Sequence, residues 1–171
     1  MEETRTMRLR RLKKKDIPYM LEWMHDSEIN QYFRFDAAGM TEEKAKEFVS
    51  KSFDDKNKHY AIVDEKDEYL GTVSLKNINS VNRDAEYAVS VRKQYHGSGV
   101  AVAATNAVLK IAFEELDLCK VYLNVLSQNI RAIRFYEKLG FKYVKEEKNS
   151  VLIGNQFHDL MWYEMQKGDL E

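Results

Sequence analysis

The chain has 171 residues, a length that suits one domain, and a formal net charge of −1. This nearly balanced charge argues against general nucleic-acid binding, which needs a basic footprint. No apolar run is long enough to span a membrane, and the N-terminus lacks the apolar core of a signal peptide. The single cysteine cannot form an intrachain disulfide, which fits a cytoplasmic location.

The sequence has no low-complexity linker and no internal repeat, so residues 1–171 are expected to form a single domain. In the first half, Asp16 is expected to cap a helix that carries Pro18 in its first turn. Thr41 is expected to cap a second helix. Two apolar runs around a polar turn predict a hairpin. The strands expected in this half are 7–12, 59–63 and 69–75.

The second half contains a stretch that alternates clearly, 84–91, which is expected to be a strand with Tyr87 on one face and Glu86 on the other. Gly140 is expected to end the last helix. The other expected elements are helices at 99–116 and 129–139 and strands at 120–126, 141–145 and 157–165. The order predicts an α/β (α+β) domain with a central, mostly antiparallel mixed sheet flanked by helices, and one strand–helix–strand crossover.

A glycine-bearing loop, Gln94–Ala101, lies between the strand 84–91 and the helix that follows. A helix start leaves several backbone N–H groups without partners and carries the positive end of the helix dipole. Glycine lets the backbone approach an anion closely. The loop therefore favours a pyrophosphate-carrying cofactor, with an ordinary turn as the alternative for the loop taken alone. The four histidines are scattered without the spacing of metal ligands, so no metal is expected.

The loop and a later helix together resemble the GNAT superfamily of N-acetyltransferases. The loop matches the family pattern Gln/Arg-x-x-Gly-x-Gly/Ala, and the helix matches Asn-x-x-Ala-x-x-Phe/Leu-Tyr-x-x-x-Gly-Phe. The matching residues are Gln94, Gly97, Gly99, Asn129, Ala132, Phe135, Tyr136, Gly140 and Phe141. The stretches 9–10, 30–33 and 155–159 look most like the branch that holds the ribosomal-protein acetyltransferases RimJ and RimL and the spermidine acetyltransferase SpeG.

The resemblance implies that acetyl-CoA is the cofactor and that its acetyl group passes directly to a primary amine. Tyr136 matches the family's general acid, and a phenol with an ordinary pKa near 10 is protonated at neutral pH. The alternative is a core tyrosine on an amphipathic helix. Glu86 is the candidate base that takes a proton from the amine, with a solvated strand face as its alternative.

The resemblance also implies a cofactor site on consecutive segments of the chain. The backbone of 89–91 is expected to pair with the pantetheine arm, which mimics a peptide edge. Asn129 is expected to contact the cofactor arm or to cap its own helix. His96 is a candidate phosphate contact or a solvated loop side chain. The expected cofactor residues are Val89, Ser90, Val91, Gln94, Tyr95, His96, Gly97, Ser98, Gly99, Val100, Ala101 and Asn129.

The sequence offers several candidates for the amine that receives the acetyl group. The stretch 23–33 reads most like acetyltransferases of nucleotide-linked amino sugars, and Tyr32, Phe33 and Arg34 offer the aromatic and basic groups such a substrate needs. These aromatic residues could instead cover the core. A protein N-terminus, an antibiotic-like small amine or a polyamine are the alternative acceptors, and a non-catalytic acetyl-CoA-binding module is the alternative class. A homodimer is expected from the family only, and neither nucleic acid nor membrane is an expected partner.

Overall fold

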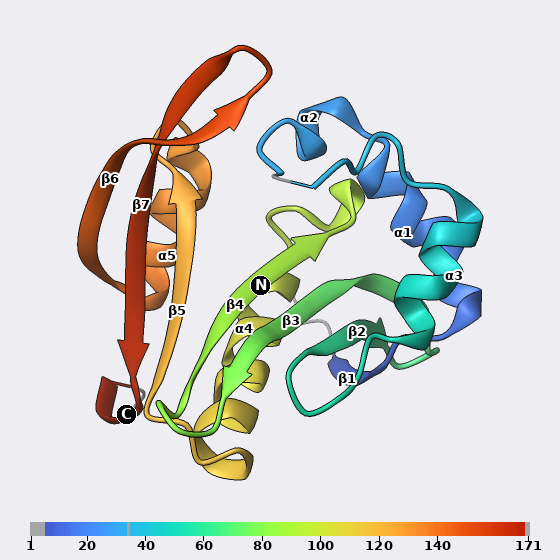
Figure 1. Ribbon diagram of the computed structural model, residues 1–171. Coiled ribbons are helices and arrows are strands. Elements are labelled where there is room, and N and C mark those ends of the chain that lie inside the picture. Colours follow the sequence, from blue (N-terminus) through green and yellow to red (C-terminus); the bar gives the residue numbers. More distant parts are fainter. Residues whose placement is uncertain (1–5, 34, 170–171) are drawn as a thin grey trace.

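The computed structural model describes residues 6–33 and 35–169, which form one seven-stranded sheet with helices on both faces (Figure 1). The strand order in the sheet is β1-β2-β3-β4-β5-β7-β6. The strands are β1 (Met7–Arg11), β2 (Lys58–Asp64), β3 (Tyr69–Asn79), β4 (Asp84–Val91), β5 (Lys120–Leu126), β6 (Lys142–Ile153) and β7 (Gln156–Gln166). The α-helices are α1 (Ile17–Met24), α2 (Ser27–Asn30), α3 (Glu42–Ser50), α4 (Val100–Lys110) and α5 (Ile130–Leu139).

Two apolar cores lie on opposite faces of the sheet. Neighbouring residues of a strand point to opposite faces, and on β2 Ile62 belongs to one core while Ala61 belongs to the other. The larger core packs the sheet against α4 and α5, and the smaller one packs it against α1 and α3. The sheet therefore separates a layer that holds α4 and α5 from a layer that holds α1 and α3.

Strands β4 and β5 are the parallel pair of the sheet, and their pairing is short. It covers 84–86 on β4 and 120–122 on β5, joined by the crossover helix α4. Beyond these residues the two strands diverge, as the V-shaped gap between their ribbons shows (Figure 1). The backbone edge of β4 from Tyr87 to Val91 is therefore not covered by β5.

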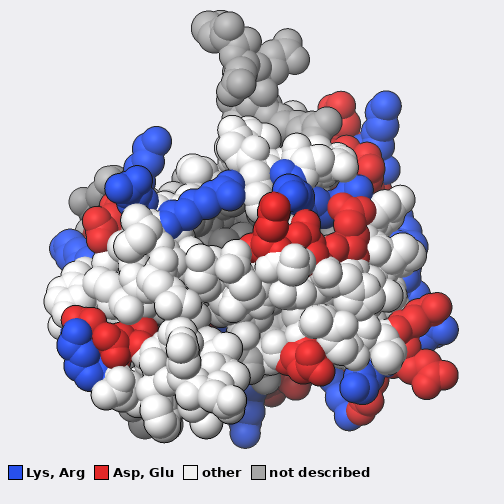
Figure 2. Space-filling model, turned by 90° about the horizontal axis from the view of Figure 1, so that it is seen from above, with Lys and Arg blue, Asp and Glu red and all other residues white. Residues whose placement is uncertain are grey.

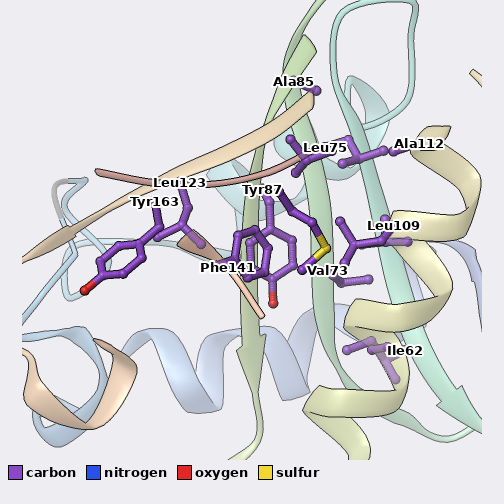
Figure 3. Packing of buried hydrophobic residues seen from close by; sticks show 14 of the residues in the cluster. Ile62, Val73, Leu75, Ala85, Tyr87, Leu109, Ala112, Leu123, Phe141 and Tyr163 are labelled. Atoms are coloured by element: carbon purple, nitrogen blue, oxygen red, sulfur yellow. The ribbon is translucent and has the colours of Figure 1, made fainter. Parts of the chain in front are cut away.

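Tyr87 lies in the core just below this divergence. Figure 3 shows its ring between Leu109 of α4 and the residues Leu123 and Tyr163 of the neighbouring strands, with Phe141 over it. Burial raises the pKa of Tyr87 well above its ordinary value, so its hydroxyl stays neutral. The floor of the gap is therefore a packed and uncharged surface.

The predicted class, the element order and the crossover are confirmed, and several details were wrong. Asp16 stands at the N-cap position of α1, but its side chain makes no cap hydrogen bond there. It is buried and accepts hydrogen bonds from Arg10 at 2.8 and 2.9 Å.

The short helix α2 was missed. The helix predicted to continue to residue 116 is α-helical only to Lys110, and a π-helical turn follows it. The final hairpin is longer than predicted.

Candidate functional site

A cavity of about 610 Å³ opens where β4 and β5 diverge. Its walls come from α2 and the segment after it, from the uncovered end of β4, from the glycine loop Gln94–Ala101 with the start of α4, and from α5. The lining residues are Glu28, Ile29, Tyr32, Phe33, Val89, Ser90, Val91, Tyr95, His96, Gly97, Gly99, Ala101, Val102, Asn129, Arg131, Ala132, Phe135, Tyr136, Lys138 and Leu139. Most of the predicted site residues thus lie around one space.

The end of β4 offers this cavity a free strand edge. Val89, Ser90 and Val91 pair with β3 on one side, through Val73, Thr72 and Gly71. On the other side β5 has already diverged. Since a strand edge is a row of N–H and C=O groups, an extended amide-containing chain can pair with it.

The glycine loop adopts the conformation that its glycines predict. Gly97 and Gly99 have φ angles of +78° and +88°, in the left-handed region that L-residues with a Cβ rarely adopt. A Cβ on either residue would meet no atom within 4 Å, so the requirement is conformational rather than steric. Gly99 is followed by the first turn of α4, where Ala101 and Val102 carry N–H groups that a helix start leaves available for an anion.

Not every residue predicted around this loop lines the cavity. The Val100 side chain is buried in the core, and Ser98 donates from Oγ to the Tyr95 carbonyl at 2.5 Å. Gln94 Oε1 accepts from Arg92 at 3.4 Å. The His96 ring does line the cavity, but its Nε2 lies 2.8 Å from the Val91 carbonyl, so the ring folds back over the end of β4.

Helix α5 presents Asn129 and Tyr136 to the cavity. Asn129 caps the helix, since its Oδ1 accepts from the Ala132 N–H at 3.3 Å, and Gly140 ends it with φ +103°. The predicted cap and stop are therefore confirmed. Arg131 and Lys138 also line the cavity and were not predicted. They lie seven residues apart and hence on one helical face, a spacing that the sequence already showed.

Tyr136 stands half-buried above Tyr87. Their rings meet edge to face, with centroids 6.0 Å apart and planes at 85°. The rings of Phe135 and Phe141 touch Tyr136 from two further sides. Beneath it, the Tyr87 hydroxyl lies 2.5 Å from Thr105 Oγ1, which itself donates to the Ala101 carbonyl at 2.7 Å. The Tyr136 ring is thus held by packing on a floor that is anchored to the first turn of α4.

Glu86 does not line this cavity. Its side chain lies on the sheet face opposite Tyr87 and forms an ion pair with Lys76, which stands directly across on β3, at 2.8 Å. Only 16% of the Glu86 side chain is exposed. The strand alternation that suggested a separate face for Glu86 is therefore correct, and this face is turned away from the larger core that holds Tyr87.

The wall formed by α2 carries Glu28, Ile29, Tyr32 and Phe33. Phe33 meets Trp23 edge to face at 5.6 Å and stacks on Phe35 at 5.3 Å, so much of its ring already packs against the protein. Glu28 is exposed and pairs with Lys93 at 2.6 Å. Arg34, the third predicted acceptor residue, lies outside the described residues.

Charges of both signs surround the cavity. Figure 2, which looks down on the end of the molecule at the top of Figure 1, shows acidic and basic side chains side by side on this face. Of the lining residues, Arg131 and Lys138 lie on α5, whereas the acid Glu28 lies on α2. Among the described residues, no group of three His, Cys, Asp or Glu side chains could hold a metal ion, and no helix is long and apolar enough to cross a bilayer.

The cavity brings together a free strand edge, a glycine loop at a helix start and a tyrosine on the facing helix, which is the combination that the resemblance to the acetyltransferases predicts for the site. The family model described as acetyltransferase (GNAT) domain matches residues 6–142, so the chain belongs to the GNAT acetyltransferase family. It is an acetyl-CoA-dependent N-acetyltransferase, as the resemblance implied. The loop and the strand edge fit a cofactor that carries a pyrophosphate and an amide-containing arm.

The relatives of the chain include enzymes with different acceptors. The spermidine N(1)-acetyltransferase of Escherichia coli (strain K12) is 28% identical over 93% of this chain and 85% of its own length. The putative ribosomal N-acetyltransferase YdaF of Bacillus subtilis (strain 168) is 31% identical over 59% of this chain and 55% of its own. Spermidine N-acetyltransferase from Vibrio cholerae, solved in complex with CoA and spermine, shares the fold with a TM-score of 0.86. It is 23% identical, and the match covers 96% of this chain and 97% of that one.

Proposed function

We propose that this enzyme transfers the acetyl group of acetyl-CoA to a primary amine of a polyamine. The similarity to a spermidine N(1)-acetyltransferase over 93% of the chain carries this proposal. The cavity supports it with Glu28, a carboxylate on the wall opposite the basic residues of α5. A polyamine carries several ammonium groups, and a carboxylate at the acceptor end of the cavity favours a cation there.

The reaction requires two proton movements that side chains of the cavity can manage. The attacking nitrogen must first lose a proton, because an ammonium has no lone pair. The departing sulfur gains a proton, and Tyr136 is the proposed donor because it lines the cavity and its ring packs against Tyr87 of β4. The backbone N–H groups of β4 are the proposed donors to the oxyanion.

The base is assigned less directly than the acid. Glu86 remains the proposed base. Because it does not line the cavity and its carboxylate is paired with Lys76, we propose that the proton reaches it through water. Water can carry a proton between the amine and a carboxylate that lies outside direct contact.

The amino-sugar acceptor expected from the sequence has weaker support than the polyamine. The relatives reported above are not amino-sugar enzymes by name. Phe33, one of the residues expected to stack on a sugar nucleotide, already packs between Trp23 and Phe35. Phe33 thus packs on the smaller core as well as lining the cavity, which supports the alternative interpretation for this residue.

A peptide N-terminus is a second candidate acceptor. YdaF, named a putative ribosomal N-acetyltransferase, is the relative that favours it, although it matches only 59% of this chain. We also propose a homodimer, and the exposed edge strand β6 is consistent with it, because Leu152 of β6 and Phe157 of the adjoining β7 are uncovered near the hairpin turn. Sedimentation analysis of the purified protein would test that assembly.

The acceptor is tested by measuring CoA release from acetyl-CoA with a panel of amines. The panel contains spermidine, spermine, free and nucleotide-linked amino sugars, aminoglycosides and short peptides with free N-termini. We expect saturable turnover with the polyamines and a kcat/KM for the other classes that is at least tenfold lower. Preferred turnover of an amino sugar or of a peptide would overturn the polyamine assignment while leaving the acetyltransferase activity intact.

A further inference from the structure

Arg92 is a buried cation at the junction between β4 and the glycine loop. Its backbone N–H donates to the Leu70 carbonyl at 2.9 Å, and its own carbonyl accepts from the Tyr95 N–H at 2.9 Å. Its side chain is only 7% exposed. A charged group is rarely buried to this extent unless it is paired, so the partners of this guanidinium indicate what the residue does.

The guanidinium binds three separate parts of the chain. Towards α1, its Nε and Nη2 donate to the two carboxylate oxygens of Glu22 at 3.1 and 3.2 Å, a two-pronged contact. Towards β3, its Nη1 donates to the Tyr69 carbonyl at 3.2 Å and to Glu68 at 3.4 Å. Towards the loop, its Nη2 donates to Gln94 Oε1 at 3.4 Å.

Two tyrosine rings complete the surroundings of Arg92. The guanidinium carbon lies 4.6 Å from the ring centroid of Tyr19 in α1 and 5.6 Å from that of Tyr95 in the glycine loop. Tyr95 lines the cavity, and His96 and Gly97 follow it directly. The side chain of Arg92 therefore lies between helix α1 and the loop, in contact with residues of both.

We propose that Arg92 is a positioning residue, which fixes the glycine loop against α1 so that the loop is preformed for the phosphates of acetyl-CoA. This inference rests on the proposed cofactor site. Arg92 does not line the cavity, and its effect passes through Tyr95 and Gln94 to the backbone that follows them. A preformed loop binds its ligand without a further ordering cost, so loosening it weakens binding rather than the chemical step.

Lysine is the informative replacement because it keeps the charge and loses the geometry. An ammonium cannot bind both oxygens of Glu22 in a planar fork, and it cannot lie flat over the ring of Tyr19. Arg10 provides a matched control. It is a comparably buried arginine, 9% exposed, whose guanidinium donates to both carboxylate oxygens of Asp16. It lies on β1, outside the cavity lining.

The experiment measures CoA binding by calorimetry and steady-state kinetics for the wild type, Arg92→Lys and Arg10→Lys. We expect both variants to melt at lower temperature than the wild type. Only Arg92→Lys should raise the dissociation constant of CoA and the KM for acetyl-CoA, by about fivefold or more, with kcat nearly unchanged. Glu22→Gln, at a residue whose side chain is 47% exposed, should show a smaller rise of the same kind without a folding defect.

Two results would overturn the inference alone. One is an unchanged CoA dissociation constant in both Arg92→Lys and Glu22→Gln while the wild type binds CoA. The other is an equal rise in Arg92→Lys and Arg10→Lys, which would make the effect one of general stability. If the wild type itself failed to bind CoA, the proposed cofactor site would be wrong as well, so the two failures are distinguishable.

Discussion

The two walls of the cavity differ in what determines their conformation. On the wall made by the glycine loop and α5, single residues determine the backbone: Gly97 and Gly99 adopt positive φ, Asn129 caps the helix and Gly140 ends it. On the wall made by α2, the helix is four residues long and Phe33 is held by contacts with rings on either side of it in the chain. The first wall is specified locally, whereas the second depends on tertiary packing.

This difference indicates where the enzyme can vary. A loop that needs left-handed backbone and a helix start tolerates few residue types, so substitutions on this wall are expected to be costly. On the wall made by α2, an exposed residue such as Glu28 can be replaced at little cost to the fold, so the acceptor can change while the fold remains. The acceptor therefore has to be argued from individual side chains such as Glu28, and the cofactor follows from the backbone.

The largest effect is expected for Tyr136→Phe, on the wall made by the glycine loop and α5. Removal of a general acid should lower kcat by about 10²- to 10⁴-fold, because the leaving sulfur loses its proton donor. The dissociation constant of CoA should stay within a factor of about two, since the ring and its packing remain. Tyr143→Phe, at an exposed tyrosine on β6, is the matched control. Full activity in Tyr136→Phe would show that another group donates the proton.

The second effect concerns the protonation of His59, a residue of β2. Burial, together with the nearby charge of Lys76, lowers the pKa of His59 from 6.5 to about 4, and the ring lies 2.6 Å from Ser74 Oγ. Between these pH values the unfolded chain binds a proton that the folded protein does not, so the free energy of unfolding falls as pH drops from 6.5 towards 4.

The measurement for His59 is urea unfolding at pH 7 and pH 5. On acidification the wild type should lose on the order of 2 kcal/mol more stability than His59→Gln, because the variant has no imidazole to protonate. Equal losses in the two proteins would show that His59 is not held neutral in the folded state.

A smaller effect is expected for Gly97→Ala, which tests whether the loop conformation matters for the cofactor. A Cβ in left-handed backbone costs about 1–2 kcal/mol. Gly154→Ala is the control, because Gly154 also has positive φ (+63°) and open space but lies in the turn between β6 and β7. Both variants should lose stability, and only Gly97→Ala should raise the KM for acetyl-CoA. A similar rise in Gly154→Ala would contradict the assignment of the loop.

The smallest effect is expected for Glu28→Gln, on the wall made by α2. Glu28 is exposed and shares its charge with Lys93, so its loss should raise the KM for spermidine only several-fold, in line with exposed ion pairs of at most about 1 kcal/mol. The KM for acetyl-CoA should not change. Glu43→Gln, at an exposed acid in the first turn of α3, is the control. An unchanged KM for spermidine would remove Glu28 from the acceptor site.

The sequence predicts the elements that carry their own signals and misses those that do not. Alternation over 84–91 predicted β4 to the residue, and Thr41 caps α3 as expected, with its Oγ1 accepting from the Lys44 N–H at 3.2 Å. Asp16 misled because a residue typical of caps is used instead as the buried partner of Arg10. A carboxylate's partner across the chain is a tertiary fact that local spacing does not contain.

The candidate site shows the same division. Gly97, Gly99 and Tyr136 stand around the cavity as the motif placed them, although their roles stay predictions. Val102, an apolar residue of α4, is 41% exposed and lines the cavity, because α4 starts with this face turned to the gap. The role of Arg92 was not predicted, because most of the hydrogen-bond partners of its side chain lie 23 to 70 positions away and only the fold brings them together.

The gap between β4 and β5 is proposed to hold the acetyl donor next to Tyr136. A crystal structure of the chain with CoA would show whether it does. We expect the pyrophosphate on the N–H groups of the glycine loop and the start of α4, the pantetheine along 89–91, and the sulfur within hydrogen-bond distance of the Tyr136 hydroxyl. CoA bound away from this gap, or a sulfur that Tyr136 cannot reach, would contradict the account.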